Sequence, residues 1–231
     1  MNRKMKFTAL ALVLVILISS LAGCAHKKKT AYQTYIQNLL DVNYKGNFED
    51  YIKESGGKET DAVSMHGECI AYLANQLITH YSLDNAKSIT INNTYQKLAE
   101  EIYSHAKYEV SEGYKKGSDY YVDIKVYPLN ILNQVYDEVF HYIDTFNKNV
   151  SAGTYNNYTK EDYEEVFAQG IADILQSKSA NIEYAEPVTV SVKMIDDGEY
   201  YYIDKDDLAR LDAAMLALEE QAPPTTEGVT E

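Results

Sequence analysis

Four side chains in one stretch of the chain are of the types that bind transition metals. His66, Glu68 and Cys69 are close in sequence, and His80 follows further along. His66 and Cys69 are three residues apart and can share a helix face, and a fourth ligand would close a tetrahedral zinc site. A polar histidine beside a buried, hydrophobic cysteine explains the same pattern. We favour this second interpretation and expect no metal site.

Acidic residues near the C-terminus raise the question of a calcium site. Asp204, Asp206 and Asp207 follow the pair Asp196-Asp197. An EF-hand loop needs glycine at its sixth position, which counted from Asp204 is Ala209. Hairpin-turn chemistry and helix capping explain these acids instead.

Sequence motifs of common enzymes are missing from the chain. It contains no G-x-S-x-G, H-E-x-x-H or C-x-x-C pattern and no phosphate-binding glycine loop. No pair of carboxylates is distinguished from the other acids as a glycosidase pair would be. We therefore expect a protein that is not an enzyme, with no catalytic residue and no cofactor.

Tyrosine is the one abundant residue that could form a site. The chain has 22 tyrosines and no tryptophan. Tyr120, Tyr200 and Tyr202 lie in two segments that alternate like strands, and aromatic rings on an exposed sheet face suit binding of sugars or peptides. We predict these three as ligand-binding residues. The alternative is that tyrosine is simply favoured in strands.

The N-terminus has the build of an export signal. Basic residues Arg3, Lys4 and Lys6 precede an apolar run over 7–22, and small residues then precede Cys24. This segment resembles a bacterial lipoprotein signal peptide, which implies cleavage before Cys24 and diacylation of its thiol. An uncleaved membrane-spanning helix, for which the run is short, and a plain secretory signal are the alternatives.

The resemblance predicts a chain held by lipid on the extracytoplasmic face of the cell membrane. We expect residues 1–23 to be the signal, 24–31 the lipidated cysteine and a tether, 32–218 one domain, and 219–231 a disordered tail. The basic run at 26–29 could lie against anionic headgroups or serve as a plain spacer.

Composition limits the partners and the source. Residues 24–231 contain 18 Lys and Arg against 35 Asp and Glu, a formal charge of −17, which repels nucleic acid.

With Cys24 lipidated, Cys69 has no disulfide partner and is expected to be buried. Arg3 and Arg210 are the only arginines, a bias that suits an AT-rich genome, as in a low-GC Gram-positive bacterium.

Apolar periodicity predicts helices over most of the chain. We expect a helix through Tyr35–Leu40, a short one at 48–52, and longer ones near 61–81 and 92–105. One further helix carries the apolar stripe from Ile131 to Phe146. Another is capped by Thr159 with Asp162 in a capping box, and the last follows a cap at Asp204 or Asp206.

Two segments alternate with a period of two and predict hairpins. The first pairs 108–110 with 122–126 through a turn at Lys115–Ser118, and the second pairs 188–194 with 200–203 through Asp196-Asp197-Gly198. Each hairpin alone would be marginal. Joined, they predict an α+β domain with a four-stranded antiparallel sheet covered by amphipathic helices.

Several short segments resemble a family of uncharacterised surface lipoproteins from Gram-positive bacteria. The resemblance covers most of residues 30–218 and implies a helix-covered, curved sheet of the cystatin or nuclear-transport-factor type. It implies no catalytic residue. The segments that carry it are Tyr44–Phe48, Ala106–Val110, Glu186–Val190 and Asp197–Tyr201.

Three functions follow as hypotheses, in order of preference. The first is a non-enzymatic surface lipoprotein that has a binding or scaffold role in the cell envelope, with an envelope protein or a small ligand as its possible partner. The second is a receptor for a small ligand (a sugar, peptide or metal) that serves a transporter or sensor. The third is an envelope hydrolase.

Overall fold

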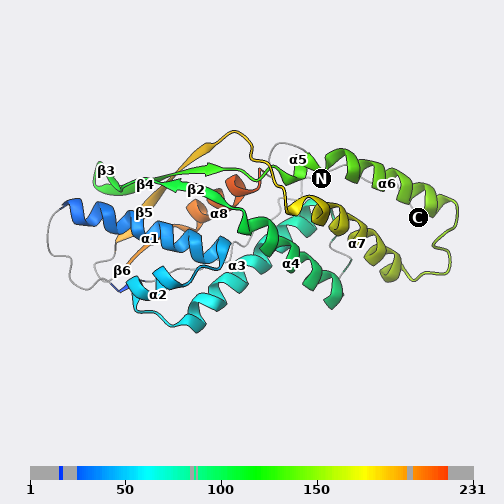
Figure 1. Ribbon diagram of the computed structural model, residues 1–231, viewed down its shortest axis with the longest axis horizontal. Helices are drawn as coiled ribbons and strands as arrows, with labels where there is room; N and C mark the ends of the chain where they lie inside the picture. The colour runs from blue at the N-terminus through cyan, green and yellow to red at the C-terminus, as the bar shows by residue number, and fades with distance from the viewer. Residues whose placement is uncertain (1–15, 18–24, 84–85, 87, 197–199, 218–231) are drawn as a thin grey trace.

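The chain folds into an α+β structure, as its periodicity predicts. In the computed structural model the described residues are 16–17, 25–83, 86, 88–196 and 200–217. Helices pack on an antiparallel sheet, and a helical hairpin extends away from that sheet (Figure 1). The helices are α1 (Ala25–Lys45), α2 (Glu49–Ser55), α3 (Glu59–His80), α4 (Ile89–Ser104), α5 (Ile131–Gln134), α6 (Tyr136–Ser151), α7 (Lys160–Ser179) and α8 (Lys205–Met215).

Pairing between the two hairpins joins them into one sheet. The strand order is β1-β6-β5-β4-β2, with β3 paired to β4. The long central strands β4 and β5 pair from Tyr120 with Met194 to Val126 with Val188. The strands are β1 (Ile16–Leu17), β2 (Lys107–Val110), β3 (Tyr114–Lys116), β4 (Asp119–Tyr127), β5 (Val188–Asp196) and β6 (Tyr200–Ile203).

One face of the sheet carries the hydrophobic core. Val122, Ile124 and Val126 of β4 are fully buried, and Val192 beside them on β5 is too. Helices α1 and α8 contact the sheet, α3 and α4 pack with α1, and α7 packs with α4. The alternation of apolar residues therefore assigns the covered face correctly, since successive strand residues point to opposite faces.

The first hairpin contains a strand where a turn is expected. Lys115 and Lys116 belong to β3, which pairs with the start of β4, and the turn lies at 117–118. The segment before β3 is interrupted because α1 comes close. The Gly113 N–H donates to the Lys29 carbonyl at 3.1 Å, and a Cβ on Gly113 would lie 3.2 Å from Tyr32.

The helix expected from Ile131 to Phe146 is two helices. Helix α5 ends at Gln134 and α6 begins at Tyr136, with Val135 between them at a φ of −99° and a ψ of −3°. Gln134 is held by the loop after α7, since its side chain donates to the Asn181 carbonyl and accepts from the Glu183 N–H. The short α5 is thus tied to that loop, while α6 turns away to form the hairpin with α7.

Helix α8 closes part of an edge of the sheet. Asp204 caps the helix by accepting from the Asp206 N–H at 2.8 Å, as expected. Strand β6 covers β5 along residues 194–196. Beyond it, Asp207 accepts from the Lys193 N–H at 2.7 Å and Arg210 donates to the Ser191 carbonyl at 2.9 Å. Side chains of α8 therefore take the place of a neighbouring strand.

The N-terminal end of the described chain differs from the expected pattern. Helix α1 begins at Ala25, within the segment for which a tether is expected. Strand β1 pairs with β6 and belongs to the segment expected to be a cleaved signal.

The capping box of α7 between Thr159 and Asp162 forms as predicted.

A substitution at Gly170 tests the packing between helices α6 and α7. A Cβ at this position would lie 2.2 Å from the ring end of Tyr142, which stacks on Phe167. We expect Gly170→Ala to lower the free energy of unfolding by about 1 kcal/mol or more, because overpacking at about 1–3 kcal/mol outweighs a helix-propensity gain of about 1 kcal/mol. The midpoint of urea denaturation at unchanged m-value measures this.

Gly67 provides the matched control. It lies in the interior of α3, is exposed, and a Cβ there would meet nothing within 4 Å. Gly67→Ala should therefore raise the free energy of unfolding, by up to about 1 kcal/mol. Equal stabilisation by both substitutions would contradict the α6–α7 packing described here.

Candidate functional site

The three tyrosines predicted as ligand-binding residues do not share a face. Tyr120 lies opposite Met194 on the covered face, and its ring meets the ring of Tyr32 on α1 edge-on at 5.4 Å. Tyr202 lies opposite Ile195 on the other face. Tyr200 is paired in β6, and its side chain lies outside the described residues. The structure thus separates Tyr120 from Tyr202.

The face of the sheet turned away from the helices is rich in tyrosine and lysine. We call it the open face, and it follows from register, because residues directly opposite one another in an antiparallel sheet point to the same side. Most of its paired positions carry aromatic, basic or acidic side chains. They are Lys107 with Tyr127, Glu109 with Lys125, Tyr114 with Tyr121, Lys116 with Asp119, Asp123 with Ser191, and Ile195 with Tyr202.

One end of the open face holds two ammonium groups against one ring. Lys107 Nζ lies 4.4 Å and Lys125 Nζ 5.0 Å from the centre of the Tyr127 ring. Lys107 also lies 5.4 Å from the ring of Tyr184. We call these four residues the aromatic–lysine patch. Cation–π contacts at exposed sites contribute about 0.5–1 kcal/mol each, so they orient the lysines while leaving their charge available.

Neighbouring side chains interact with the charged groups of the patch. The Tyr127 hydroxyl donates to the Glu109 carboxylate. A hydrogen bond with Tyr127 and the charge of Glu109 raise the pKa of Lys125. Among the ion pairs of the described residues, none involves Lys107 or Lys125. Both lysines can therefore meet a carboxylate of a partner without breaking an existing ion pair.

The middle of the open face is ordered by hydrogen bonds. Tyr114 and Tyr121 stack with ring centres 6.1 Å apart. The Tyr114 hydroxyl donates to Asp123 Oδ1 at 2.9 Å, and Ser191 Oγ donates to the same oxygen at 2.6 Å. These polar groups satisfy one another, so this part of the face is a hydrogen-bonded, half-buried surface next to the patch.

A pocket lies beside α8, at the start of β5. Its volume is about 280 Å³, close to the lower end of the range of roughly 300–1,000 Å³ for small-molecule sites. Apolar side chains line most of it, and Glu186 and Arg210 supply charge. The lining residues are Pro128, Ala185, Glu186, Val188, Arg210, Ala213, Ala214 and Ala217.

A half-buried carboxyl group, that of Asp212, lies between α8 and the helices α1 and α4. The Tyr44 hydroxyl donates to Asp212 Oδ1 at 2.5 Å. Burial raises the pKa of Asp212 to about 6, although the hydrogen bond from Tyr44 acts in the opposite direction. The hydroxyl of Tyr103, which stacks on Tyr44, is buried without a hydrogen-bond partner. Removing this carboxyl from water thus costs stability once it ionises.

The side chains considered above as metal ligands make other contacts. His66 Nδ1 lies 3.0 Å from the Asn43 carbonyl oxygen, and His80 meets the ring of Tyr81 edge-on at 4.7 Å. Cys69 packs against the core, and burial raises the pKa of its thiol, which makes it a poor nucleophile. Within the described part of the chain, no three His, Cys, Asp or Glu side chains are grouped as metal ligands.

Sequence reasoning missed the aromatic–lysine patch. Lys107, Lys125 and Tyr127 alternate with apolar residues, so their face was predictable, but their grouping depends on the register between β2 and β4. Tyr184 lies outside the named strands, where a single bridge with Leu129 positions it. No periodic signal in the sequence could have found that residue.

Comparison with known proteins gives a likeness of fold. No protein-family model matches the sequence, and no curated protein matches it. A crystal structure of a putative lipoprotein from Bacillus subtilis matches with a TM-score of 0.52 and 17% identity, over 83% of this chain. The match spans 56% of that protein. Of the helices in the described residues, none has the length and apolarity to cross a bilayer.

The half-buried carboxyl of Asp212 predicts a pH dependence of stability. A pKa near 6 in the folded state exceeds the unfolded value, so the folded state holds the proton more tightly. The free energy of unfolding should fall as pH rises from about 4 to 6. Asp212→Asn keeps an acceptor for Tyr44 and should be more stable than the wild type above pH 6, by about 2 kcal/mol.

Urea denaturation of both proteins at pH 4, 5, 6 and 7 tests this. Their difference isolates Asp212 from the other acids that titrate in the same range. Asp173→Asn, on the exposed side of α7, is the control and should leave the pH profile unchanged. A constant difference between wild type and Asp212→Asn across this range would contradict the prediction.

Proposed function

We propose that the chain is a lipid-anchored, extracytoplasmic binding protein without enzymatic activity. Its partner is a protein of the cell envelope. Its binding surface is the aromatic–lysine patch of the open face. The observation that carries the proposal is the position of Lys107 and Lys125 against the Tyr127 ring, on the face of the sheet that the helices of the described residues leave open.

The anchor is supported by the sequence around Cys24. A basic start, an apolar run and the small residues before Cys24 stand in the order that a lipoprotein signal requires. The Bacillus subtilis protein of similar fold is itself described as a putative lipoprotein. The buried core of the described residues runs from Tyr32 to Leu216, so cleavage before Cys24 leaves that core whole.

The patch has the chemistry of a protein-binding surface. Tyrosine supplies a large, rigid contact area and is enriched at interfaces. The two lysines carry charge opposite in sign to most of this acidic chain, which favours a partner that presents carboxylates at this position. Complementary charges across such a surface select the partner and its orientation.

A receptor for a small ligand is the second candidate, and the pocket beside α8 supports it. Its apolar lining and the charges of Glu186 and Arg210 match the usual composition of ligand sites. A ligand bound there would stabilise the fold by mass action. A thermal-shift screen with sugars, peptides and metal ions distinguishes this function, because a protein partner is absent from it.

Acylation of Cys24 predicts where the protein is found in cells. Cys24→Ser removes the thiol, so labelling with radioactive palmitate should be lost and the protein should leave the membrane fraction. Cys69→Ala is the matched control and should keep both properties, because Cys69 packs against the core. Membrane attachment that survives Cys24→Ser would contradict the anchor.

Removing the two lysine charges of the aromatic–lysine patch should weaken binding of the partner protein. Crosslinked protein is recovered from native membranes, and the proteins that come with it are quantified by mass spectrometry. Lys107→Gln with Lys125→Gln should lower the recovery of the specific partner about tenfold or more, since residues at the centre of an interface each contribute about 2 kcal/mol.

A control variant removes the same number of positive charges from another part of the molecule. Lys148→Gln with Lys160→Gln removes two lysines from α6 and α7, where they pair with Asp144 and Glu164. Recovery should then be unchanged. If the patch variant and this control recover the same proteins in the same amounts, the patch is not the binding surface.

A further inference from the structure

The lipid attachment point is joined to the folded domain without a linker. Helix α1 begins at Ala25, the residue directly after Cys24. Tyr32, Tyr35 and Ile36 of this helix are buried, so α1 is part of the core. Consecutive Cα atoms are about 3.8 Å apart. If Cys24 is acylated, as the proposed function requires, the start of α1 must lie within a few ångströms of the headgroups.

Contacts bring the hairpin of β3 and β4 to the same end of the molecule. The Gly113 N–H donates to the Lys29 carbonyl at 3.1 Å. Lys28 Nζ lies 3.0 Å from Asp196 Oδ2, and Lys193 Nζ lies 2.8 Å from Asp119 Oδ2. We call residues 28–30, 111–119 and 193–196 the anchor end. Figure 1 shows β3 beside the start of α1, at the opposite end from the α6–α7 hairpin.

The anchor end is basic in an acidic protein. The whole chain has 21 Lys and Arg against 35 Asp and Glu. The anchor end has five lysines against the three acids Glu112, Asp119 and Asp196. Asp119 and Asp196 are neutralised by Lys193 and Lys28. The remaining lysines are Lys29, Lys115 and Lys116, and both of those in β3 are exposed.

Aromatic rings lie beside one of these lysines, Lys116. Lys116 Nζ lies 5.8 Å from the centre of the Tyr121 ring, which stacks on Tyr114. Tyrosine is favoured where a surface meets lipid headgroups, since one end of the side chain is apolar and the other is polar. The hairpin therefore combines exposed positive charge with aromatic rings.

From this arrangement we infer that the anchor end docks on anionic lipid headgroups and fixes the orientation of the domain on the membrane. Each lysine near such a surface contributes about 1 kcal/mol, within a Debye length of about 8–10 Å. Cys24 supplies attachment, and Lys29, Lys115 and Lys116 supply orientation. Tyr127 is eight residues beyond Asp119 on β4, roughly 26 Å away, so the aromatic–lysine patch faces a partner away from the headgroups.

Amine footprinting tests this orientation without relying on acylation by the cell. The chain from Cys24 on is coupled through its thiol to vesicles that contain a maleimide lipid. One set of vesicles is phosphatidylcholine, and the other also contains phosphatidylglycerol. Acetylation of each lysine by a brief pulse of reagent is then measured by mass spectrometry.

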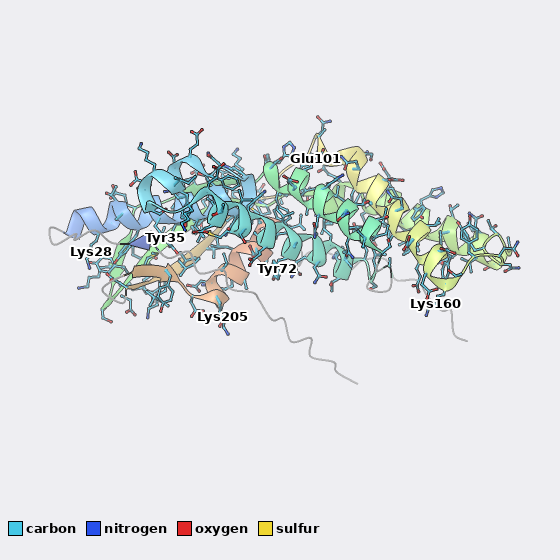
Figure 2. All side chains as sticks on the ribbon, turned by 90° about the horizontal axis from the view of Figure 1, so that it is seen from below. Lys28, Tyr35, Tyr72, Glu101, Lys160 and Lys205 are labelled. Atoms are coloured by element: carbon cyan, nitrogen blue, oxygen red, sulfur yellow. The ribbon has the colours of Figure 1, made fainter. Side chains whose placement is uncertain are left out.

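Lys29, Lys115 and Lys116 should react at least threefold more slowly on the anionic vesicles than on the neutral ones. High salt should remove the difference, because it screens the headgroup charge. Lys160 is the internal control and should react equally on both, since it lies at the opposite end of the molecule from Lys28 (Figure 2). Equal protection of all lysines, or none, would overturn the inference.

Unanchored protein gives an independent measurement. Lys115→Gln with Lys116→Gln should weaken binding of the chain to anionic vesicles on the order of tenfold, from about 1 kcal/mol for each charge. Lys148→Gln with Lys160→Gln should not weaken it, and an equal effect of both variants counts against the anchor end. Failure of palmitate labelling at Cys24 would reject the anchor alone, because neither vesicle experiment depends on it.

Discussion

The structure depends on the pairing of β4 with β5. This ladder joins two hairpins that come from distant parts of the chain, and neither hairpin would be stable by itself. Its register puts Val122 beside Val192 and Ile124 beside Val190, which gives the helices one apolar surface to cover. The same register assigns Lys125 and Asp123 to the other face. A shift by one residue would exchange the two faces.

A second constraint acts on the interior. Tyr32, Tyr44 and Tyr103 are almost fully buried, so the core contains hydroxyl groups that need partners. Tyr32 donates to Asp196 and Tyr44 to Asp212. Carboxylates from the C-terminal third of the chain thereby meet tyrosines of α1. The abundance of tyrosine in this sequence thus serves the core as well as the surface.

Local signals in the sequence predicted most elements, and pairing between elements decided the rest. The capping box at Thr159, the two hairpins and the α+β class are visible in residue types and periods. The interruption at Gly113 is not visible, because it comes from contact with Lys29 on another element. The break at Val135 depends in the same way on the loop that binds Gln134. Tyr120 and Tyr202 were grouped by composition, while register separates them.

Helix α8 also sets the order in which the domain can be completed. It supplies Asp207 and Arg210 to the backbone of β5, and it is the last helix of the described chain. Chains emerge from the ribosome, or from an export channel, with their N-terminal end first. The Ser191 carbonyl and Lys193 N–H therefore stay unprotected until α8 has emerged. During that interval the strand is open to pairing with another copy, and the docking of α8 ends that exposure.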